Sequence, residues 1–365
     1  MSEWQTFCLK DLVKIFGGST PSTNNPKNYG NKIRWITAKD LSTLQGRYIK
    51  KGSRSISRLG FKSCSTFLLP KHAILFSVRA PIGYTAIISK RSCTDRGLMG
   101  LVPNKKIYFE FLYYLLKYHK DNISNMGVGT TFKGISKPAL GLFKVKIPPT
   151  YYEQQKIART LSILDQKIEN NHKINELLHT LAYKIYEYYF KYKPKNAKLE
   201  QIIIENPKSS IMVKNAQKTQ DKYPFFTSGD NILSYPKAII DGRNCFLNTG
   251  GNAGIKFYVG KASYSTDTWC ICANEFSDYL YLLLSSIKTH INQSFFQGTS
   301  LKHLQKNLLK KYPIYMPSSH EIKKFNQIIM PLLTLISINT RTSKKLEQIR
   351  DFLLPLLLKQ QVKPQ

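Results

Sequence analysis

Between Glu153 and Phe190 apolar residues recur at alternating intervals of four and three positions, and no glycine or proline interrupts them. Two asparagines, Asn171 and Asn175, are the polar members of this stripe. A stripe kept up over about five heptads is typical of a helix that packs against another helix. The pattern therefore predicts one long helix, roughly 57 Å in length at about 1.5 Å per residue.

A second stripe of the same kind begins at Phe325, which stands in it where Ile157 stands in the first. Asn339 and Ser343 likewise stand where Asn171 and Asn175 do, and the residues just before each stripe also match. We interpret this correspondence as an internal repeat. The side chains expected to pack helix against helix are Ile157, Leu161, Leu164, Ile168, Asn171, Leu178, Ile185, Phe325, Ile329, Leu332, Ile336, Asn339, Leu346 and Leu353.

The two copies differ because Pro331 and Pro355 lie inside the second stripe, where we expect them to kink the helix or fray its end. Helices with apolar stripes of this length cannot stay exposed, and each is the other's simplest partner. We expect them to pack antiparallel, with Asn171 and Asn339 near their midpoints. There the two asparagines are either buried residues that set the register or solvent-facing ones, and the sequence favours neither.

The sequence before each long helix reads as short strands separated by turns. In the first copy, Ala73–Ile88 predicts strand, turn and strand, Tyr108–Lys120 predicts a helix, and Phe143–Ile147 predicts a further strand. The second copy repeats this order in shorter form, which indicates deletions in loops. The corresponding stretches are Trp35–Asp40 with Phe225–Asp230, Ile74–Gly83 with Cys245–Gly254, Thr94-Asp95 with Thr266-Asp267, and Gly129–Lys133 with Gly298–Lys302.

The order along the chain is therefore globular domain, helix, globular domain, helix. We expect an α+β fold in which two mixed α/β domains are separated by two long antiparallel coiled-coil helices, related by a pseudo-two-fold internal repeat. The predicted boundaries are a first domain at 1–150, a first helix at 151–193, a second domain at 194–317 and a second helix at 318–365.

The charge is distributed unevenly over these parts. The formal net charge is +33, but residues 153–190 carry five basic and five acidic side chains and residues 321–358 carry six and three, which leaves +30 outside them. Two basic globular domains on a nearly neutral frame indicate nucleic acid as the first partner to consider, with an anionic membrane surface as the weaker alternative. The start of the chain does not resemble a signal peptide, no apolar run would span a membrane, and the six cysteines show no paired spacing, so we expect a reduced, cytoplasmic protein.

Five stretches in order carry a resemblance to a known family. They are Gly17–Ser22, Arg34–Ser42, Ala73–Gly83, Gly129–Phe132 and, most of all, Ile147–Ile157 leading into the long helix. In this order they resemble the specificity subunit of type I restriction–modification systems, over nearly the whole chain. The resemblance implies two target-recognition domains that each read half of a split sequence in double-stranded DNA, and helices that separate these domains.

The resemblance also implies partners. Two methyltransferase subunits would dock on this chain and bring S-adenosylmethionine, and restriction subunits would bring ATP and Mg²⁺, so no cofactor or metal is expected in the chain itself. The residues at the start of the helices that would dock a methyltransferase are Glu153, Gln154, Gln155, Lys156, Glu321 and Lys324. The second copy lacks the paired glutamines of the first, which weakens the expectation there.

Candidate DNA contacts are polar residues on turns, because affinity comes largely from cations at phosphates and specificity from a few side chains at base edges. We expect them at Lys39, Arg47, Arg54, Arg58, Arg79, Lys133, Asn248, Asn252, Lys256 and Lys302. For each of them a solvated surface charge or a turn-stabilising amide is an equally good interpretation.

The sequence argues against catalysis by this chain. Pro148 and Pro149 are not preceded by the Asn or Asp of an adenine-methyltransferase motif, and no glycine cluster opens a Rossmann-like helix. Glu321-Ile-Lys323 matches a nuclease string, but no predicted strand surrounds it. A stand-alone sequence-specific DNA-binding protein without restriction–modification partners, and an enzyme with an unrecognised site, are the alternative functions.

Overall fold

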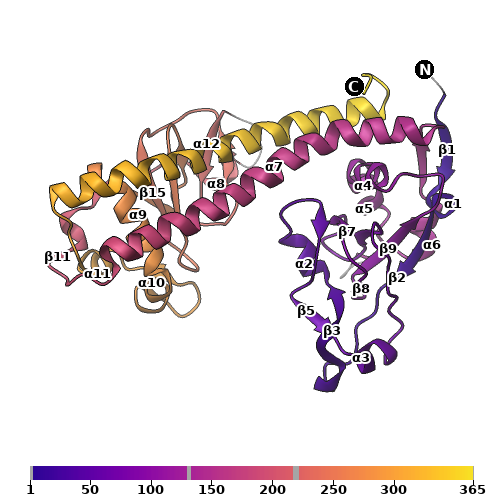
Figure 1. The fold of residues 1–365 in the computed structure, drawn as a ribbon, viewed down its shortest axis with the longest axis horizontal. Helices are drawn as coiled ribbons and strands as arrows, with labels where there is room; N and C mark the ends of the chain where they lie inside the picture. The colour runs from indigo at the N-terminus through magenta and orange to yellow at the C-terminus, as the bar shows by residue number, and fades with distance from the viewer. Residues whose placement is uncertain (1–2, 130–132, 217–221, 365) are drawn as a thin grey trace. The chain divides into compact units, whose positions relative to one another are not determined.

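The computed structural model describes residues 3–129, 133–216 and 222–364, and the elements carry the labels of Figure 1. The chain divides into two compact units. Unit 1 is Met1–Asn170 with Ser343–Gln365, and unit 2 is Asn171–Thr342. Both long helices contribute to both units, so each unit combines one globular part with a segment of each helix. The functional division at 150, 193 and 317 remains a proposal.

The two predicted long helices are present. α7 runs over Tyr151–Tyr186 and continues as one π-helical stretch, η2, over Glu187–Lys191, while α12 runs over Ser319–Leu358. α12 continues through both Pro331 and Pro355, and it ends three residues after Pro355, at Leu358. Tertiary packing outweighs the local preference at Pro331, because Ile329 and Leu333 on either side of it are buried. None of the described helices is long and apolar enough to span a membrane.

Within each unit the two helix segments pack antiparallel. In unit 2, Asn339 donates a hydrogen bond to the Asn175 side-chain oxygen at 2.9 Å, and Phe190 contacts Phe325 nearer the other ends of the segments. Asn339 is thus half-buried against the facing helix, where it bonds to Asn175. This polar pair suits the role of setting register.

The predicted packing positions are not equally buried. Ile157, Leu161 and Ile168 on α7 are buried, as are Phe325, Ile329 and Ile336 on α12. The others are half-buried, namely Leu164, Asn171, Leu178, Ile185, Leu332, Asn339, Leu346 and Leu353. The helix ends therefore serve as parts of two globular cores as well as packing against each other.

The globular part of unit 1 is built on a five-stranded sheet of order β2-β9-β6-β7-β4, a three-stranded sheet β5-β3-β8, and the pair β1-β10. Its strands are β1 (Gln5–Cys8), β2 (Val13–Gly17), β3 (Tyr29–Ile36), β4 (Tyr48–Ile49), β5 (Arg54–Ile56), β6 (Ile74–Ser77), β7 (Thr85–Ile88), β8 (Cys93–Thr94), β9 (Leu98–Pro103) and β10 (Lys144–Ile147). Its short helices are α1 (Leu9–Leu12), η1 (Pro26–Asn28), α2 (Ala38–Ser42), α3 (Arg58–Lys62), α4 (Phe109–Tyr118), α5 (Lys120–Asn125) and α6 (Lys137–Leu142). The predicted strand–turn–strand at 73–88 is β6 and β7, and the predicted helix at 108–120 is α4.

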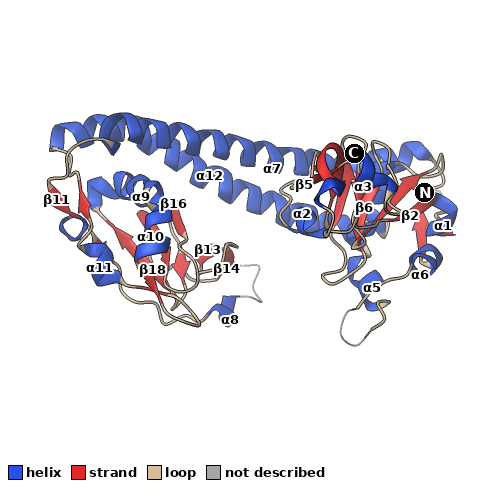
Figure 2. Cartoon of the chain, turned by 90° about the horizontal axis from the view of Figure 1, so that it is seen from below, coloured by secondary structure: helices blue, strands red, loops and turns tan. Residues whose placement is uncertain are grey.

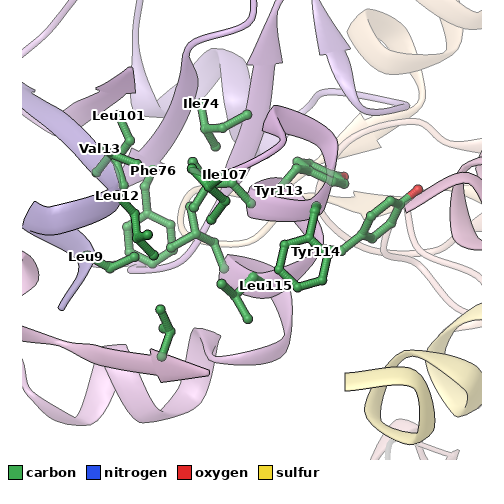
Figure 3. Close-up of a cluster of buried hydrophobic side chains, with 14 of the residues drawn as sticks. Leu9, Leu12, Val13, Ile74, Phe76, Leu101, Ile107, Tyr113, Tyr114 and Leu115 are labelled. Atoms are coloured by element: carbon green, nitrogen blue, oxygen red, sulfur yellow. The ribbon is translucent and has the colours of Figure 1, made fainter. Parts of the chain in front are cut away.

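The core of unit 1 lies between the five-stranded sheet and α4. Phe76 from β6 and Leu12 from α1 meet the residues that lead into and form α4, as Figure 3 shows. Ile157 and Leu161 of α7 and Leu357 of α12 belong to the same buried cluster. Burial of this shared apolar surface holds the globular part on its helix segments.

Unit 2 contains a four-stranded sheet β12-β18-β15-β16, a three-stranded sheet β14-β13-β17, and the pairs β11-β21 and β19-β20. Its strands are β11 (Ala197–Lys198), β12 (Ile204–Glu205), β13 (Tyr223–Phe226), β14 (Leu233–Tyr235), β15 (Arg243–Asn248), β16 (Ile255–Val259), β17 (Ser263–Tyr264), β18 (Thr268–Cys272), β19 (Phe296–Gln297), β20 (His303–Leu304) and β21 (Pro313–Ile314). Its short helices are η3 (Leu199–Gln201), α8 (Val213–Ala216), η4 (Asn274–Phe276), α9 (Ser277–Ser286), α10 (Lys288–Ser294) and α11 (Lys306–Lys310). Figure 2 shows α9 between the strands of this unit and its long-helix segments.

The strand registers confirm the internal repeat and correct one of its alignments. β3 pairs with β8 in parallel, with Trp35 opposite Cys93, and β13 pairs with β17 in the same way, with Phe225 opposite Ser263. Cys93 and Ser263 are therefore equivalent, and the same step along the chain makes Ser265 the counterpart of Asp95. The predicted match of Thr94-Asp95 with Thr266-Asp267 was wrong by two positions. The prediction aligned two identical Thr-Asp pairs, whereas equivalent positions are defined by strand pairing, which the sequence alone does not show.

Candidate nucleic-acid interface

In unit 1, loops from distant parts of the sequence meet beyond the carboxyl ends of the parallel strands β3 and β8. The Asp95 backbone N–H donates to the Ile36 carbonyl at 3.0 Å, and the Ser19 N–H donates to the Thr94 carbonyl at 3.0 Å. A Cβ atom added to Gly18 would lie 1.9 Å from the Asp95 carbonyl oxygen. Only glycine allows the backbone to approach this closely, so Gly18 packs the first loop against the loop after β8.

The loop after β6 and the segment before α6 complete this group. The Val78 N–H donates to the Gly97 carbonyl at 2.9 Å, and the Ile135 N–H donates to the Val78 carbonyl at 2.9 Å. Arg79, Arg96 and Lys133 each stand close to one of these bonds in the sequence, and all three side chains are exposed. We name these loops, which present Lys39, Arg79, Arg96 and Lys133, face 1. Residues 130–132 of the Gly129–Phe132 motif lie outside the described residues.

Lys39 is held on face 1 by a capping box. The Asp40 carboxylate accepts from the Thr37 N–H at 2.8 Å and from the Ser53 N–H at 2.8 Å. Burial raises the pKa of Asp40, but these backbone donors and the Thr37 hydroxyl lower it by more, so its pKa lies below the ordinary value. The carboxylate is therefore charged and directs Lys39, the second residue of α2, outward.

Asp95 lies at the centre of face 1. Its carboxylate accepts from the Gly97 N–H at 3.0 Å, which closes the turn that carries Arg96. Burial raises the pKa of Asp95, against the opposing effects of the Gly97 and Ala38 N–H groups and of Arg79. The carboxylate thus organises the loops, and the cations around it face solvent.

Unit 2 repeats this arrangement at equivalent positions. The Ser265 N–H donates to the Phe226 carbonyl at 2.9 Å, the Thr249 N–H to the Asp267 carbonyl at 3.2 Å, and the Leu304 N–H to the Thr249 carbonyl at 3.0 Å. These are the counterparts of the Asp95, Val78 and Ile135 bonds. We name the corresponding loops, residues 227–230, 249–254, 265–267 and 298–303, face 2.

Two of the four DNA contacts predicted in the second domain form hydrogen bonds within the loops and do not face solvent. Asn248 is buried, and its side-chain N–H donates to the Asn252 carbonyl at 3.1 Å. Lys256 Nζ donates to the Thr227 carbonyl at 2.7 Å and to Asn248 Oδ1 at 3.2 Å, and burial lowers its pKa. Asn252 and Lys302 are exposed, and the Lys302 carbonyl accepts from the Gly251 N–H at 2.9 Å.

Arg47 lies inside unit 1, where DNA cannot reach its side chain. The residue is 3% exposed, and its guanidinium pairs with Glu110 at 3.2 Å and with Glu169 at 3.1 Å. The expectation failed because an arginine beside a turn gives no sign of carboxylates supplied by α4 and α7. Arg54 and Arg58 are exposed, but they open β5 and α3, outside the bonds that join face 1; Arg54 lies over the Tyr29 ring at 4.7 Å.

The residues predicted to dock a methyltransferase also fall into two groups. Gln154 is buried and accepts from the Tyr108 N–H at 2.8 Å, while Glu321 accepts from the Ser318 N–H at 2.9 Å as a helix cap. Gln155 and Lys156 line an open groove of about 910 Å³, together with Tyr152, Arg159, Ile163 and Leu353. Glu153 is half-buried, and Lys324 is exposed.

Sequence reasoning missed several residues of the two faces, among them Arg96, Thr266 and His303. Arg96 and Thr266 are equivalent once the register that pairs Cys93 with Ser263 is used, and His303 is the counterpart of Gly134. A prediction that aligned the copies by strand pairing rather than by matching letters would have found them.

Comparisons with known proteins match both copies of the repeat. The family described as type I restriction modification DNA specificity domain matches residues 1–180 and 195–348. The type I restriction enzyme MjaIX specificity subunit of Methanocaldococcus jannaschii is 29% identical, over 98% of this chain and 93% of its own. The HindI specificity subunit of Haemophilus influenzae is 27% identical, over 46% of this chain and 37% of its own.

The crystal structure of a type I restriction–modification S subunit from M. genitalium shares the fold. Its TM-score is 0.64 at 18% identity, over 97% of this chain and 96% of that one. Specificity subunits are the non-catalytic parts of type I restriction–modification complexes. With both domain matches, the repeated loops and the long helices in place, this chain belongs to the type I restriction–modification DNA specificity family.

Proposed function

We propose that this chain reads a bipartite, asymmetric DNA target, one half-site with face 1 and the other with face 2. The observation that supports this most strongly is the repeated loop arrangement, in which the same backbone bonds position different side chains. A shared frame with different side chains suits two readers of unlike sequences. The basic excess favours the same function, because residues 1–150 carry 25 basic and six acidic side chains and residues 191–320 carry 17 and eight.

The proposal assigns the gap between the half-sites to α7 and α12. α7 is one helix of 36 residues, or about 54 Å at about 1.5 Å per residue, and α12 has 40 residues. Each helix supplies packing residues to both units, so lengthening both by the same number of turns would change the spacing without removing a contact inside either unit.

Partner docking is assigned to the open groove beside the start of α7. Exposed apolar side chains at Tyr152 and Ile163 flank the cations Lys156 and Arg159 there. A methyltransferase subunit would cover this surface and supply S-adenosylmethionine, and a restriction subunit would supply ATP and Mg²⁺. The buried Gln154 and the capping Glu321 act instead by shaping the starts of the helices.

The test combines selection of bound DNA with an engineered spacer. Selection from random duplexes by the purified chain should return two unlike conserved blocks separated by a gap of constant length. Inserting one heptad that continues the apolar stripe after Asn170, and another after Thr342, should leave both blocks unchanged. The gap should lengthen by about 10 Å, or about three base pairs at about 3.4 Å each.

A folded insertion variant that keeps the original gap would show that the helices do not set the spacing. A single conserved block would contradict the bipartite target. Adding a methyltransferase subunit from the same genome distinguishes a specificity subunit from the alternative, a stand-alone DNA-binding protein. Methyl transfer to the selected duplex only in the mixture supports the specificity subunit, whereas transfer by this chain alone would contradict its non-catalytic role.

A further inference from the structure

The two faces share a backbone frame but differ in the chemistry that they present. Lys39, Arg79 and Arg96 of face 1 have Gly229, Gly250 and Thr266 as their counterparts in face 2. The bridges Arg79 to Gly134 and Gly250 to His303 establish the second of these equivalences directly. Three cations on one face are therefore replaced by two glycines and a hydroxyl on the other, and only Lys133 and Lys302 keep the charge.

Arg79 and Arg96 also form a pair by register. β6 and β9 are antiparallel with Ser77 opposite Leu98, and Val78 bonds to the Gly97 carbonyl, so the next positions outward are Arg79 and Arg96. Both side chains are exposed, and neither guanidinium makes a hydrogen bond or an ion pair with another described residue. Two guanidinium groups with their donors open to a ligand thus stand at paired positions where the loops end.

Guanidinium groups have one preferred base partner in the major groove. The arginine fork donates two parallel hydrogen bonds to O6 and N7 of guanine, whereas adenine offers a donor at the position of O6. Hydroxyl and amide groups, such as Thr266 and Asn252, read other base edges. The chemistry of the two faces therefore differs at the level of the base that each can recognise.

From this we infer that Arg79 and Arg96 are specificity-determining residues that read guanine in the half-site bound by face 1, and that face 2 reads its half-site without an arginine. The inference rests on the proposed function, since it requires that the faces bind DNA. To the proposed function it adds the residues that contact the base edges, the base that they recognise and the half-site in which that base lies.

The experiment compares DNA selections by the wild-type chain and by two double variants. Replacing both arginines by glutamine (R79Q with R96Q) should abolish the guanine preference in one block, by roughly ten- to hundredfold for each contact, and leave the other block unchanged. The control, K90Q with R91Q, removes the same charge from exposed residues just before β8, away from face 1. It should leave both blocks unchanged, and thermal unfolding should show that all variants are folded.

Replacing both arginines by lysine (R79K with R96K) separates charge from geometry. It should keep the salt dependence of binding while weakening the guanine preference, because lysine lacks the planar fork. If the glutamine variant instead binds every sequence more weakly by the same factor, and loses about 0.9 of salt slope per arginine with unchanged base preferences, the arginines contact phosphates only and the inference is wrong. If the wild-type chain selects no sequence, the proposed function fails, and the inference fails with it.

Discussion

The two units join their globular parts to the long helices through arginines that pair with equivalent acidic residues but come from different places in the repeat. Glu110 on α4 and Asp278 on α9 are equivalent in the internal repeat, and each pairs with a buried or half-buried arginine, Arg47 or Arg243. The arginines are not equivalent, because Arg47 precedes β4 whereas Arg243 opens β15. The repeated helix therefore carries an acidic residue at the same position in both copies, while its partner comes from a different strand.

The difference is larger between the helices themselves. In unit 1, Asp165 and Arg350 form an ion pair at 2.7 Å, and the Tyr114 hydroxyl donates to Asp165 at 2.5 Å. The positions equivalent to Asp165 and Arg350 in unit 2 are Leu333 and Ala182, and both are buried. At these two positions, unit 1 thus needs complete pairing of charges, whereas unit 2 needs only apolar packing. A buried ion pair adds directional constraint without assured stability, whereas its disruption is costly.

The largest effect should come from breaking the ion pair. Replacing Asp165 by alanine leaves Tyr114 without its acceptor and Arg350 with only the exposed Asp351 as an ion-pair partner. It should lower the free energy of unfolding by about 3–5 kcal/mol. Installing the residues of unit 2 (D165L with R350A) should recover much of this loss, because no unpaired charge is then buried between the helices. Urea unfolding monitored by circular dichroism measures both. A double variant less stable than D165A would show that the apolar solution does not transfer to unit 1.

A middle-sized effect is expected at the start of the helices, where Gln154 of unit 1 corresponds to Ile322 of unit 2. The Gln154 amide also donates to the carbonyls of Lys106 at 2.9 Å and Pro148 at 3.2 Å. Replacing it by isoleucine strands these buried groups and should cost about 2–3 kcal/mol. The reciprocal I322Q variant buries an amide among apolar groups and should cost a similar amount. If either variant keeps the unfolding midpoint of the wild type, the two helix starts do not depend on having glutamine in one unit and isoleucine in the other.

The smallest effect concerns the acidic residues of the faces, Asp40 and Asp230. Asp40 holds a capping box, so D40N should cost about 1 kcal/mol at neutral pH, whereas the exposed Asp230 should tolerate the same change. Because folding lowers the pKa of Asp40, its contribution is present above the ordinary value of 3.8 and is lost as the pH falls through the folded-state pKa. The difference between wild type and D40N should therefore shrink in acid. A stability difference between wild type and D40N that grows in acid would contradict the lowered pKa of Asp40.

Local patterns were sufficient for much of the fold. The heptad stripes predicted both long helices, because periodicity reports which face of a helix is buried. The two apolar runs separated by a turn at 73–88 predicted β6 and β7. The helix does not end at Pro331, since packing on both sides of a proline can hold a helix that local preference would end. The family resemblance, which rested on ordered short motifs, is confirmed by the match over both copies.

The candidate site was only partly predictable. Lys39, Arg79, Lys133, Asn252 and Lys302 do reach the two faces, but the same reasoning also chose Arg47, Asn248 and Lys256, whose side chains turn inward. Residue type and a nearby turn indicate only that a side chain is polar and close to the surface. They do not state whether a carboxylate or carbonyl from another element is near enough to bind it.

The amino-acid sequence by itself determined the repeat, the helices, the basic charge of the globular parts and the family, because each of these is a property of local order or of composition. Tertiary structure alone decided that Asp165 meets Arg350, that Asn175 meets Asn339, and which loops assemble around Asp95. These contacts join residues far apart in the chain. Their energies depend on distance and burial, which strand register and helix packing define and which no run of neighbouring residues encodes.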